Sequence, residues 1–268
     1  MQDQTYDIGS DYEYNYVRGP AFSSAAPTDA GGDGSLKSFL GVDVGSRIGI
    51  AAGLLLNSKW ILGYAERGFD ILTYKTVRSS HRDCYPHPNW VFVEKSESEE
   101  GTYHVVDEVS DDPSRISSSV CFGMPSMAPE VWREDVAKAK ASLGEGKMLI
   151  VSVVASPEAG WTHGDVAQDF VRCASWAAEA GADAVEANFS CPNVCSAEGS
   201  IYLDVSASRQ IASSIRGAVG DTPLLIKTGY FSEEAKLAAY LRALDGVADG
   251  VTLVNCITGR VLRSDGRP

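Results

Sequence analysis

Apolar runs of strand length alternate with stretches of helical periodicity through the second half of the chain. Met148 to Val154 is a continuous apolar run, which predicts a strand that is covered on both faces. The same pattern predicts further strands at 182–188, 223–227 and 250–255, with helices at 130–143, 164–180, 203–218 and 232–245. Helices that lead from one strand to the next form right-handed crossovers, which make the strands parallel. The pattern therefore predicts an α/β fold built on a parallel sheet.

Two of the predicted helices have a repeating apolar face that should pack on the sheet. The helix at 203–218 places Ile211 and Ile215 one turn apart on the same side. The helix at 232–245 begins with acidic residues, which interact favourably with the positive end of a helix dipole. Its apolar spacing predicts three buried side chains, namely Leu237, Leu241 and Leu244.

The first part of the chain is less regular. Residues 1–38 are rich in Asp, Gly, Ser and Tyr and have no periodicity, so they are expected to form a disordered leader outside the fold. Residues 39–268 would then form one domain. Within it, residues 79–115 hold many charged and turn residues around one alternating piece at 90–93, which predicts an excursion with a small hairpin.

Polar residues recur at the ends of the predicted strands. Two earlier strands are expected at 48–52 and 69–75, and polar residues lie at or near the carboxyl ends of five of the six strands: Lys75, Ser152, Asn188, Lys227 and Asn255. A (β/α)8 barrel builds its active site from the ends of many strands, whereas a doubly wound sheet uses one switch point, usually with a glycine-rich phosphate turn. The first turn, Ala51-Ala52-Gly53, lacks that glycine pattern. A TIM-type barrel is therefore favoured, with about six of its eight βα units present.

Composition and charge restrict the function. The net charge of −13 opposes binding to phosphate backbones, so a small-molecule ligand is expected and a nucleic-acid partner is not. No apolar run approaches the roughly 20 residues that span a membrane. The six cysteines are scattered rather than arranged as a disulfide framework, which is typical of a cytoplasmic protein. The four histidines lack ligand-like spacing, so no metal site is expected.

The stretch from Asn188 to Asn193 combines two carboxamides, a hydroxyl and a thiol where a strand should give way to a loop. Pro192 fixes its own φ and favours extended geometry at Cys191, so the thiol lies on a stiff backbone. Two interpretations are open. The thiol is a nucleophile or general base of a site, or it is the buried cysteine of an ordinary turn. The sequence gives Cys191 no obvious histidine partner, which favours proton abstraction over nucleophilic attack.

Two lysines and three asparagines indicate what the site would bind. Lys75 and Lys227 are expected at buried strand ends, where a cation is costly unless a negative group faces it. Each lysine alone could be a surface residue, but the pair favours a shared anionic or electron-rich ligand. Asn188, Asn193 and Asn255 offer amide donors and acceptors that suit a planar heterocycle with imide groups.

These segments resemble a known family. The string Asn188-Phe189-Ser190-Cys191-Pro192-Asn193 resembles a signature of the dihydroorotate dehydrogenase catalytic domain, as do Lys75-Thr76, Ile226-Lys227 and Val254-Asn255. The same domain occurs as the pyrimidine-reducing domain of dihydropyrimidine dehydrogenase. The resemblance runs from about Ser46 to Gly259. It implies a (β/α)8 barrel that binds FMN and oxidises dihydroorotate to orotate in pyrimidine biosynthesis.

The resemblance also implies a role for each matching residue. Cys191 would be the general base, as in the soluble cysteine-type enzymes, while hydride passes to the flavin. Residues implied to contact FMN are Lys75, Thr76, Asn188 and Lys227, with the turn Ala51-Ala52-Gly53 packed against it. Residues implied to hold the pyrimidine are Asn188, Asn193 and Asn255.

Two features depart from the family pattern. The family usually has an asparagine before Phe-Gly in one substrate loop, whereas Val120-Cys121 precedes Phe122-Gly123 here. This departure makes a dihydropyrimidine or other cyclic-imide oxidoreductase an alternative. The chain also stops at Pro268, so the last two βα units, with the loops for the FMN phosphate, are expected to be missing. The chain would then be a fragment, a non-catalytic truncated barrel, or one that a homodimer partner or another chain completes.

Overall fold

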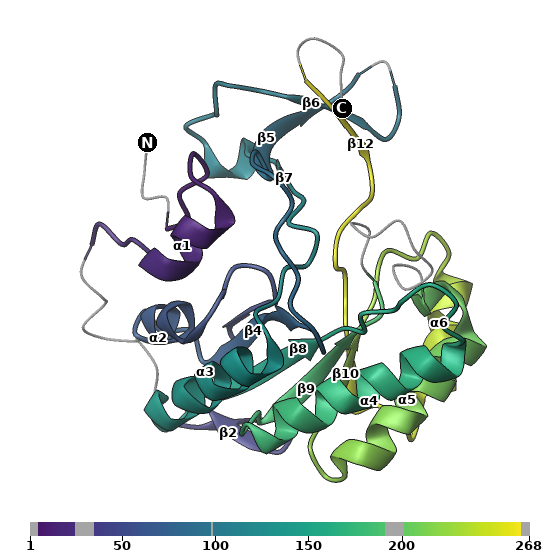
Figure 1. The fold of residues 1–268 in the computed structure, drawn as a ribbon. Coiled ribbons are helices and arrows are strands. Elements are labelled where there is room, and N and C mark those ends of the chain that lie inside the picture. Colours follow the sequence, from purple (N-terminus) through teal and green to yellow (C-terminus); the bar gives the residue numbers. More distant parts are fainter. Residues whose placement is uncertain (1–4, 25–34, 98, 191–200, 264–268) are drawn as a thin grey trace.

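The computed structural model describes residues 5–24, 35–97, 99–190 and 201–263 (Figure 1). Its main feature is a parallel sheet whose strand order follows the sequence: β3 (Gly49–Ile50), β4 (Ile71–Val77), β8 (Met148–Val153), β9 (Ala184–Asn188), β10 (Leu224–Lys227) and β11 (Gly250–Thr252). The predicted strands, their order and their direction are confirmed. A doubly wound sheet would reverse its order about the first strand, and this order therefore excludes it.

Helices connect these strands and cover the outer face of the curled sheet (Figure 1). They are α2 (Ser58–Ala65), α3 (Pro129–Ser142), α4 (His163–Glu179), α5 (Val205–Val219) and α6 (Glu234–Leu244). On α5, Ile211 and Ile215 are buried as predicted. On α6, Leu244 is buried as predicted and Leu237 is partly buried. The predicted burial of Leu241 is wrong, because this side chain is 41% exposed. Its neighbour Tyr240 faces the core instead, about 100° further round the helix.

The inner face of the sheet changes from apolar to polar along the strands. At the amino-terminal end, the strands β1 (Lys37–Phe39) and β2 (Val42–Val44) form a hairpin that packs against the curled sheet. Val44 of this hairpin belongs to a buried cluster with Ile71, Met148, Ile150, Ala184 and Leu225. Side chains alternate along a strand, so Glu186 and then Asn188 follow Ala184 on the same face of β9. The architecture is a mixed α/β fold around a curled half-barrel, and closure into eight strands stays a prediction.

A second, smaller sheet stands over the carboxyl ends of the main sheet (Figure 1). Its strands are β5 (Trp90–Lys95), β6 (Thr102–Val105), β7 (Ser118–Val120) and β12 (Arg260–Leu262). The antiparallel pair of β5 and β6 is the predicted hairpin within the excursion. The strand β12 pairs with β6 in parallel, so the end of the described chain returns to this sheet.

Part of the segment expected to be a disordered leader is folded. Residues 12–18 form the helix α1 (Tyr12–Arg18), and Asp11 caps it by accepting a hydrogen bond from the backbone N–H of Tyr14. Tyr6 is only 3% exposed and belongs to the main hydrophobic core. The prediction is therefore wrong for residues 5–24, because aromatic contacts with the core hold a segment that has no periodicity of its own. It is also wrong for Lys37 and Ser38, which pair with Val44 and Asp43 in the hairpin of β1 and β2.

Candidate functional site

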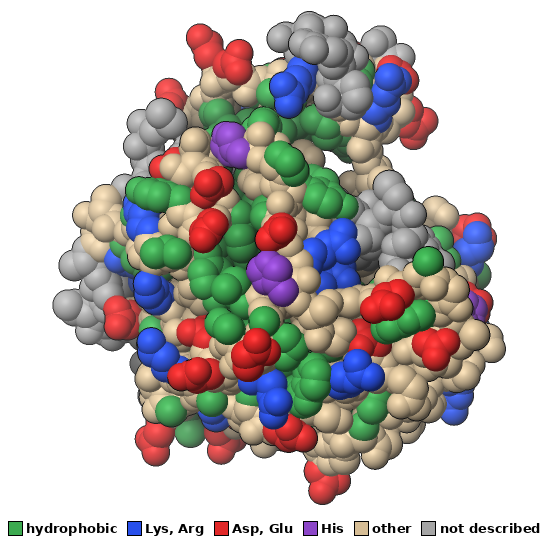
Figure 2. Space-filling view, viewed as in Figure 1, with side chains coloured by type: hydrophobic (Ala, Val, Ile, Leu, Met, Phe, Trp, Pro, Cys, Tyr) green, Lys and Arg blue, Asp and Glu red, His purple; other side chains and the backbone are tan. Residues whose placement is uncertain are grey.

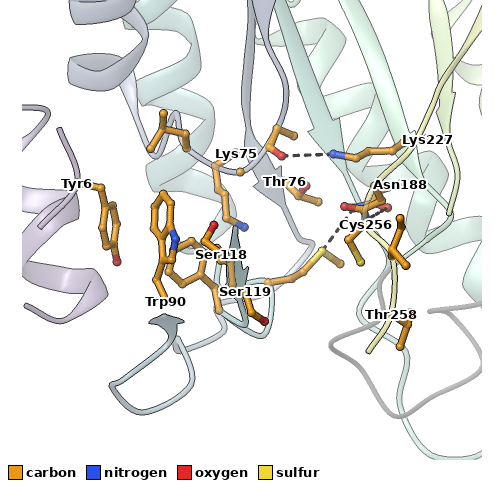
Figure 3. A pocket seen from close by; sticks show the side chains of 18 of the residues that line it. Tyr6, Lys75, Thr76, Trp90, Ser118, Ser119, Asn188, Lys227, Cys256 and Thr258 are labelled. Carbon is orange, nitrogen blue, oxygen red and sulfur yellow. Dashed lines mark hydrogen bonds between the residues drawn. The ribbon is translucent and has the colours of Figure 1, made fainter. Parts of the chain in front are cut away.

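A cavity of about 470 Å³ lies between the carboxyl edge of the main sheet and the smaller sheet (Figure 3). Lys75, Trp90 and Ser118 stand on one side of it, and Asn188, Lys227 and Cys256 stand on the other. The volume falls within the range of roughly 300–1,000 Å³ that is usual for small-molecule sites. This edge is also where parallel β/α proteins place their ligands.

The cavity brings together most of the residues singled out in the sequence. Its lining includes Ala52, Gly53, Lys75, Thr76, Asn188, Lys227 and Asn255. Ala51 is exposed and does not belong to this lining. Cys191 and Asn193 lie outside the described residues, so their roles stay predictions. Asn188, three residues before Cys191 in the sequence, lines the cavity.

Lys227 is a buried cation on the floor of the cavity. It is 4% exposed, and its Nζ donates to the backbone carbonyl of Ala52 at 3.3 Å. Its Nζ also lies 3.9 Å from Oε1 of Glu186, which is 2% exposed. That oxygen has no hydrogen-bond partner among the described residues. A buried charge requires a counter-charge, and the attraction between these two groups supplies it for both.

Asn188 organises the start of the loop after β9. Its Oδ1 accepts hydrogen bonds from the backbone N–H of Ser190 at 3.1 Å and from Nδ2 of Asn255 at 3.4 Å. Asn255 also donates to the backbone carbonyl of Ser190. The Nδ2 group of Asn188 donates to the sulfur of Met124 at 3.5 Å, and a thioether is a weak acceptor. A ligand oxygen would therefore compete well for the Asn188 amide.

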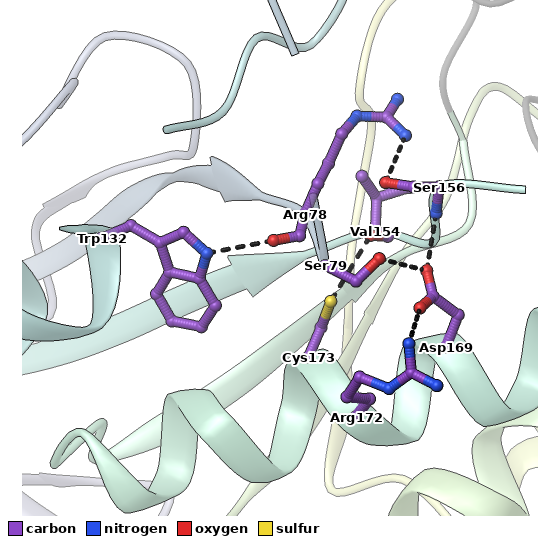
Figure 4. Close-up of polar contacts among 8 residues, drawn as sticks. All are labelled: Arg78, Ser79, Trp132, Val154, Ser156, Asp169, Arg172 and Cys173. Carbon is purple, nitrogen blue, oxygen red and sulfur yellow. Dashed lines mark hydrogen bonds and ion pairs between the residues drawn. The ribbon is translucent and has the colours of Figure 1, made fainter. Parts of the chain in front are cut away.

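Buried polar groups tie the loops after β4 and β8 together (Figure 4). The guanidinium of Arg78, which is buried, donates to the backbone carbonyls of Met124 at 3.0 Å and Ala155 at 2.6 Å. The buried carboxylate of Asp169 on α4 accepts from the Ser79 hydroxyl and from the Ser156 backbone N–H, each at 2.8 Å. The loops after β4 and β8 are thus fixed to each other and, through the Met124 carbonyl, to the segment between β7 and α3.

Arg78→Met is expected to lower the free energy of unfolding by about 3 kcal/mol, because two buried carbonyls lose a charged donor. Urea denaturation followed by circular dichroism measures this loss. Arg133→Met is the matched control, since the ion pair between Arg133 and Glu179 is largely solvated and should contribute about 1 kcal/mol or less. Equal losses in the two variants would show that Arg78 does not hold the loops.

The cysteines of the described chain differ in their environments. Burial raises the pKa of the Cys84 thiol to about 11, and burial raises the pKa of Cys173 well above its usual range. Both thiols are therefore protonated near neutral pH and are unsuited to act as bases. Cys256 lines the cavity.

Several residues of the cavity were not expected from the sequence. Trp90 and Ser118 belong to the smaller sheet, and Tyr6 comes from the amino-terminal segment. Strand-end reasoning on the main sheet could not find them, because they reach the cavity from elements outside it. For Trp90, the sequence offered one signal of a strand, the alternating pattern that begins at this residue.

The face of the molecule shown in Figure 2 carries charges of both signs. Figure 2 shows acidic and basic side chains interspersed across one face, with apolar side chains between them. No group of three or more His, Cys, Asp or Glu residues that could hold a metal occurs within the described ranges. No helix in the described part of the chain combines the length and apolar character needed to cross a membrane.

The fold and the cavity define a β/α half-barrel protein with a cavity at the carboxyl edge of its sheet. A curated dihydroorotate dehydrogenase from Dictyostelium discoideum is 35% identical over 245 residues, which cover 87% of this chain and 65% of that protein. The chain is thus homologous to a dihydroorotate dehydrogenase and spans about two-thirds of that protein's length. This identity confirms the resemblance inferred from the sequence.

A solved structure shares the fold. The crystal structure of DHODH in complex with ferulenol from Eimeria tenella matches 80% of this chain and 58% of that chain, with a TM-score of 0.59. Sequence identity to it is 14%, so this likeness concerns the fold. No family model matches the sequence.

Proposed function

We propose that this protein is an FMN-dependent oxidoreductase that oxidises dihydroorotate to orotate. The observation that supports this most is the meeting of Lys75, Lys227, Asn188 and Asn255 in one cavity. These residues come from four separate strand ends, in a homologue of a dihydroorotate dehydrogenase. The two cations suit an electron-rich ring, and the two carboxamides suit a ring with alternating carbonyl and N–H groups.

The cavity fits the ring system of FMN. Lys75 and Lys227 provide cationic donors at 5% and 4% exposure, and an isoalloxazine has nitrogen and oxygen acceptors along its pyrimidine edge. The turn at Ala52 and Gly53 has small side chains, and a Cβ at Gly53 would meet nothing within 4 Å, which leaves room for a flat ring. FMN, when bound, supplies the hydride acceptor. Lys75, Thr76, Lys227 and Asn188 would hold it.

The chain's own residues would handle the proton and the orientation of the substrate. Oxidation of the CH–CH bond of dihydroorotate removes a hydride from one carbon and a proton from the other. The acidic proton is on the carbon next to the ring carbonyl, and Cys191 would accept it as general base. Asn188, Asn193 and Asn255 would hold the ring in place. The hydrogen bond that the Ser190 N–H donates to Asn188 Oδ1 fixes the backbone that leads to Cys191.

One observation favours a second substrate class. Val120 lines the cavity where an asparagine was expected, so one amide contact to the ring is replaced by an apolar side chain. A less polar cyclic imide or an unsubstituted dihydropyrimidine is the substrate that this change favours.

The test uses the 268-residue protein. After loading with FMN without oxygen, it is mixed with dihydroorotate or with dihydrouracil, and loss of the visible flavin absorbance is followed. We expect dihydroorotate to bleach the flavin and dihydrouracil to leave it oxidised. Bleaching by dihydrouracil alone would assign the second substrate class. Tight FMN binding with no bleaching by either compound would contradict both assignments.

A further inference from the structure

We propose that Arg78 is a positioning residue for the cavity, which sets the shape of one wall through Met124 without touching a ligand. Arg78 is 2% exposed and does not belong to the cavity lining, whereas Met124 does. The inference rests on the proposed function in its choice of orotate as the first probe. It gives the buried guanidinium a role in binding beyond its contribution to stability.

Met124 has a backbone conformation that its side chain disfavours. Its φ is 54°, and the preceding Gly123 has a φ of 73°. A left-handed residue with a side chain is uncommon, and such residues cluster at functional sites because the surrounding structure holds them there. The turn needs glycine at Gly123, since a Cβ there would lie 2.7 Å from the Tyr85 ring. For Met124, contacts with the rest of the protein have to offset the cost of the conformation.

The turn places its side chains on the cavity. Phe122 and Met124 both line it, although only Gly123 separates them. The Met124 sulfur accepts a hydrogen bond from Nδ2 of Asn188 at 3.5 Å. Asn188 is proposed to hold both the flavin and the pyrimidine, so a shift of Met124 would alter the surface that a flat ring meets.

The guanidinium of Arg78 holds the middle of this turn. Its Nε donates to the Met124 carbonyl at 3.0 Å, and its Nη1 donates to the Ala155 carbonyl at 2.6 Å. Arg78 is itself fixed, because its backbone carbonyl accepts from Trp132 Nε1 at 3.0 Å (Figure 4). A planar fork serves two carbonyls on different loops, whereas a lysine ammonium on a flexible stem does not reproduce that geometry.

The two ends of the turn have anchors of their own. The Phe122 carbonyl accepts from the Tyr85 N–H at 3.0 Å. Ser126 exchanges two backbone hydrogen bonds with Arg82, at 2.9 and 3.0 Å. The middle of the turn takes part in neither contact, so the guanidinium of Arg78 decides whether it stays left-handed.

Arg78→Lys tests this role, because it keeps the charge and loses the fork. Calorimetric titration of the FMN-loaded protein should show orotate binding weakened by about 10-fold, the value of one hydrogen bond to a charged group. Arg133→Lys is the matched control and should bind orotate as the parent does, because the ion pair of Arg133 with Glu179 is largely solvated. Equal losses of affinity in the two variants would overturn the proposal.

Met124→Gly separates positioning from general support of the fold. Glycine adopts a left-handed conformation without strain, and it has no side chain that could reach Asn188. Whatever the affinity of Met124→Gly for orotate, adding Arg78→Lys to it should change that affinity by less than about 2-fold, because residues that act through one another are coupled. If the full loss caused by Arg78→Lys persisted in the double variant, Arg78 would not act through Met124.

Hydrogen exchange of the ligand-free protein gives a readout that needs no substrate. The backbone N–H groups of Cys121 and Ser126 donate to the carbonyls of Asn89 and Arg82, so their exchange reports opening of the turn. Arg78→Lys should speed exchange within residues 120–127 by about 10-fold more than within α4, because the opening is local. Acceleration no greater in residues 120–127 than in α4 would contradict the positioning role.

The proposed function can fail while this inference stands. If the parent binds FMN and does not bind orotate, the proposed substrate is wrong. Fluorescence titration with FMN then takes the place of orotate for the parent, the two single variants and the double variant. The same coupling is expected there, because Asn188 is also a proposed flavin contact. If the parent binds neither ligand, or if Arg78→Lys binds both as tightly as the parent, the inference is overturned.

Discussion

Cys191→Ala is expected to slow reduction of bound FMN by dihydroorotate by about 10²–10⁴-fold, the contribution of a well-placed general base. The affinity for FMN should stay nearly unchanged, because alanine removes the proton acceptor and no proposed flavin contact. Rapid-mixing absorbance measurements without oxygen give the rate of flavin reduction, and fluorescence titration gives the affinity.

Cys84→Ala is the matched control for Cys191→Ala. Burial raises the pKa of Cys84 to about 11, so this thiol is protonated at neutral pH and its removal should leave the rate of reduction unchanged. If Cys191→Ala reduced its flavin as fast as the parent, another group would have to take the proton. If both variants were slow, general damage to the fold would be the cause.

Lys227→Met should lower the free energy of unfolding by about 3 kcal/mol. The variant leaves the carboxylate of Glu186 buried at 2% exposure without its cation. Loss of one partner of a buried ion pair typically costs about 3–5 kcal/mol, and the 3.9 Å separation of these charges places the effect at the lower end. Urea denaturation of the protein without FMN measures the change.

The double variant Lys227→Met, Glu186→Gln separates structure from binding. Neutralising Glu186 should restore most of the lost stability, because no charge is then left unpaired. Affinity for FMN should remain low in both variants, since each lacks the Lys227 ammonium group. Restored binding together with restored stability would mean that Lys227 supports the fold and does not contact the flavin. An unchanged stability in Lys227→Met would mean that Glu186 does not depend on that lysine.

The main sheet and half of the site were predictable from the sequence for a physical reason. Parallel strands covered on both faces appear as apolar runs, and their carboxyl ends meet at one edge. Lys75, Asn188 and Lys227 could therefore be placed together without knowing any contact. The buried face of α6 was harder to predict. Tyr240 and Leu241 are adjacent and both have large apolar groups, and only the packing against the core decides which of them is buried.

The second wall of the cavity could not be predicted from local patterns. The strand β12 pairs with β6 although the two are far apart in the sequence, and nothing local in either segment specifies the other. The amino-terminal segment is polar and aperiodic, and it is held by the burial of Tyr6 and by the hydrogen bond that Trp60 Nε1 donates to the Asn15 carbonyl. Long-range contacts of this kind leave no periodic signal in a single sequence.

The connection between the two sheets forms one wall of the cavity. Residues 253–259 leave β11 of the main sheet and reach β12 of the smaller one, and Asn255, Cys256, Ile257, Thr258 and Gly259 on this segment line the cavity. The segment is held at both ends, because β11 pairs with β10 and β12 pairs with β6. A change in its length is therefore expected to alter the shape of the cavity before it alters the pairing of the main sheet.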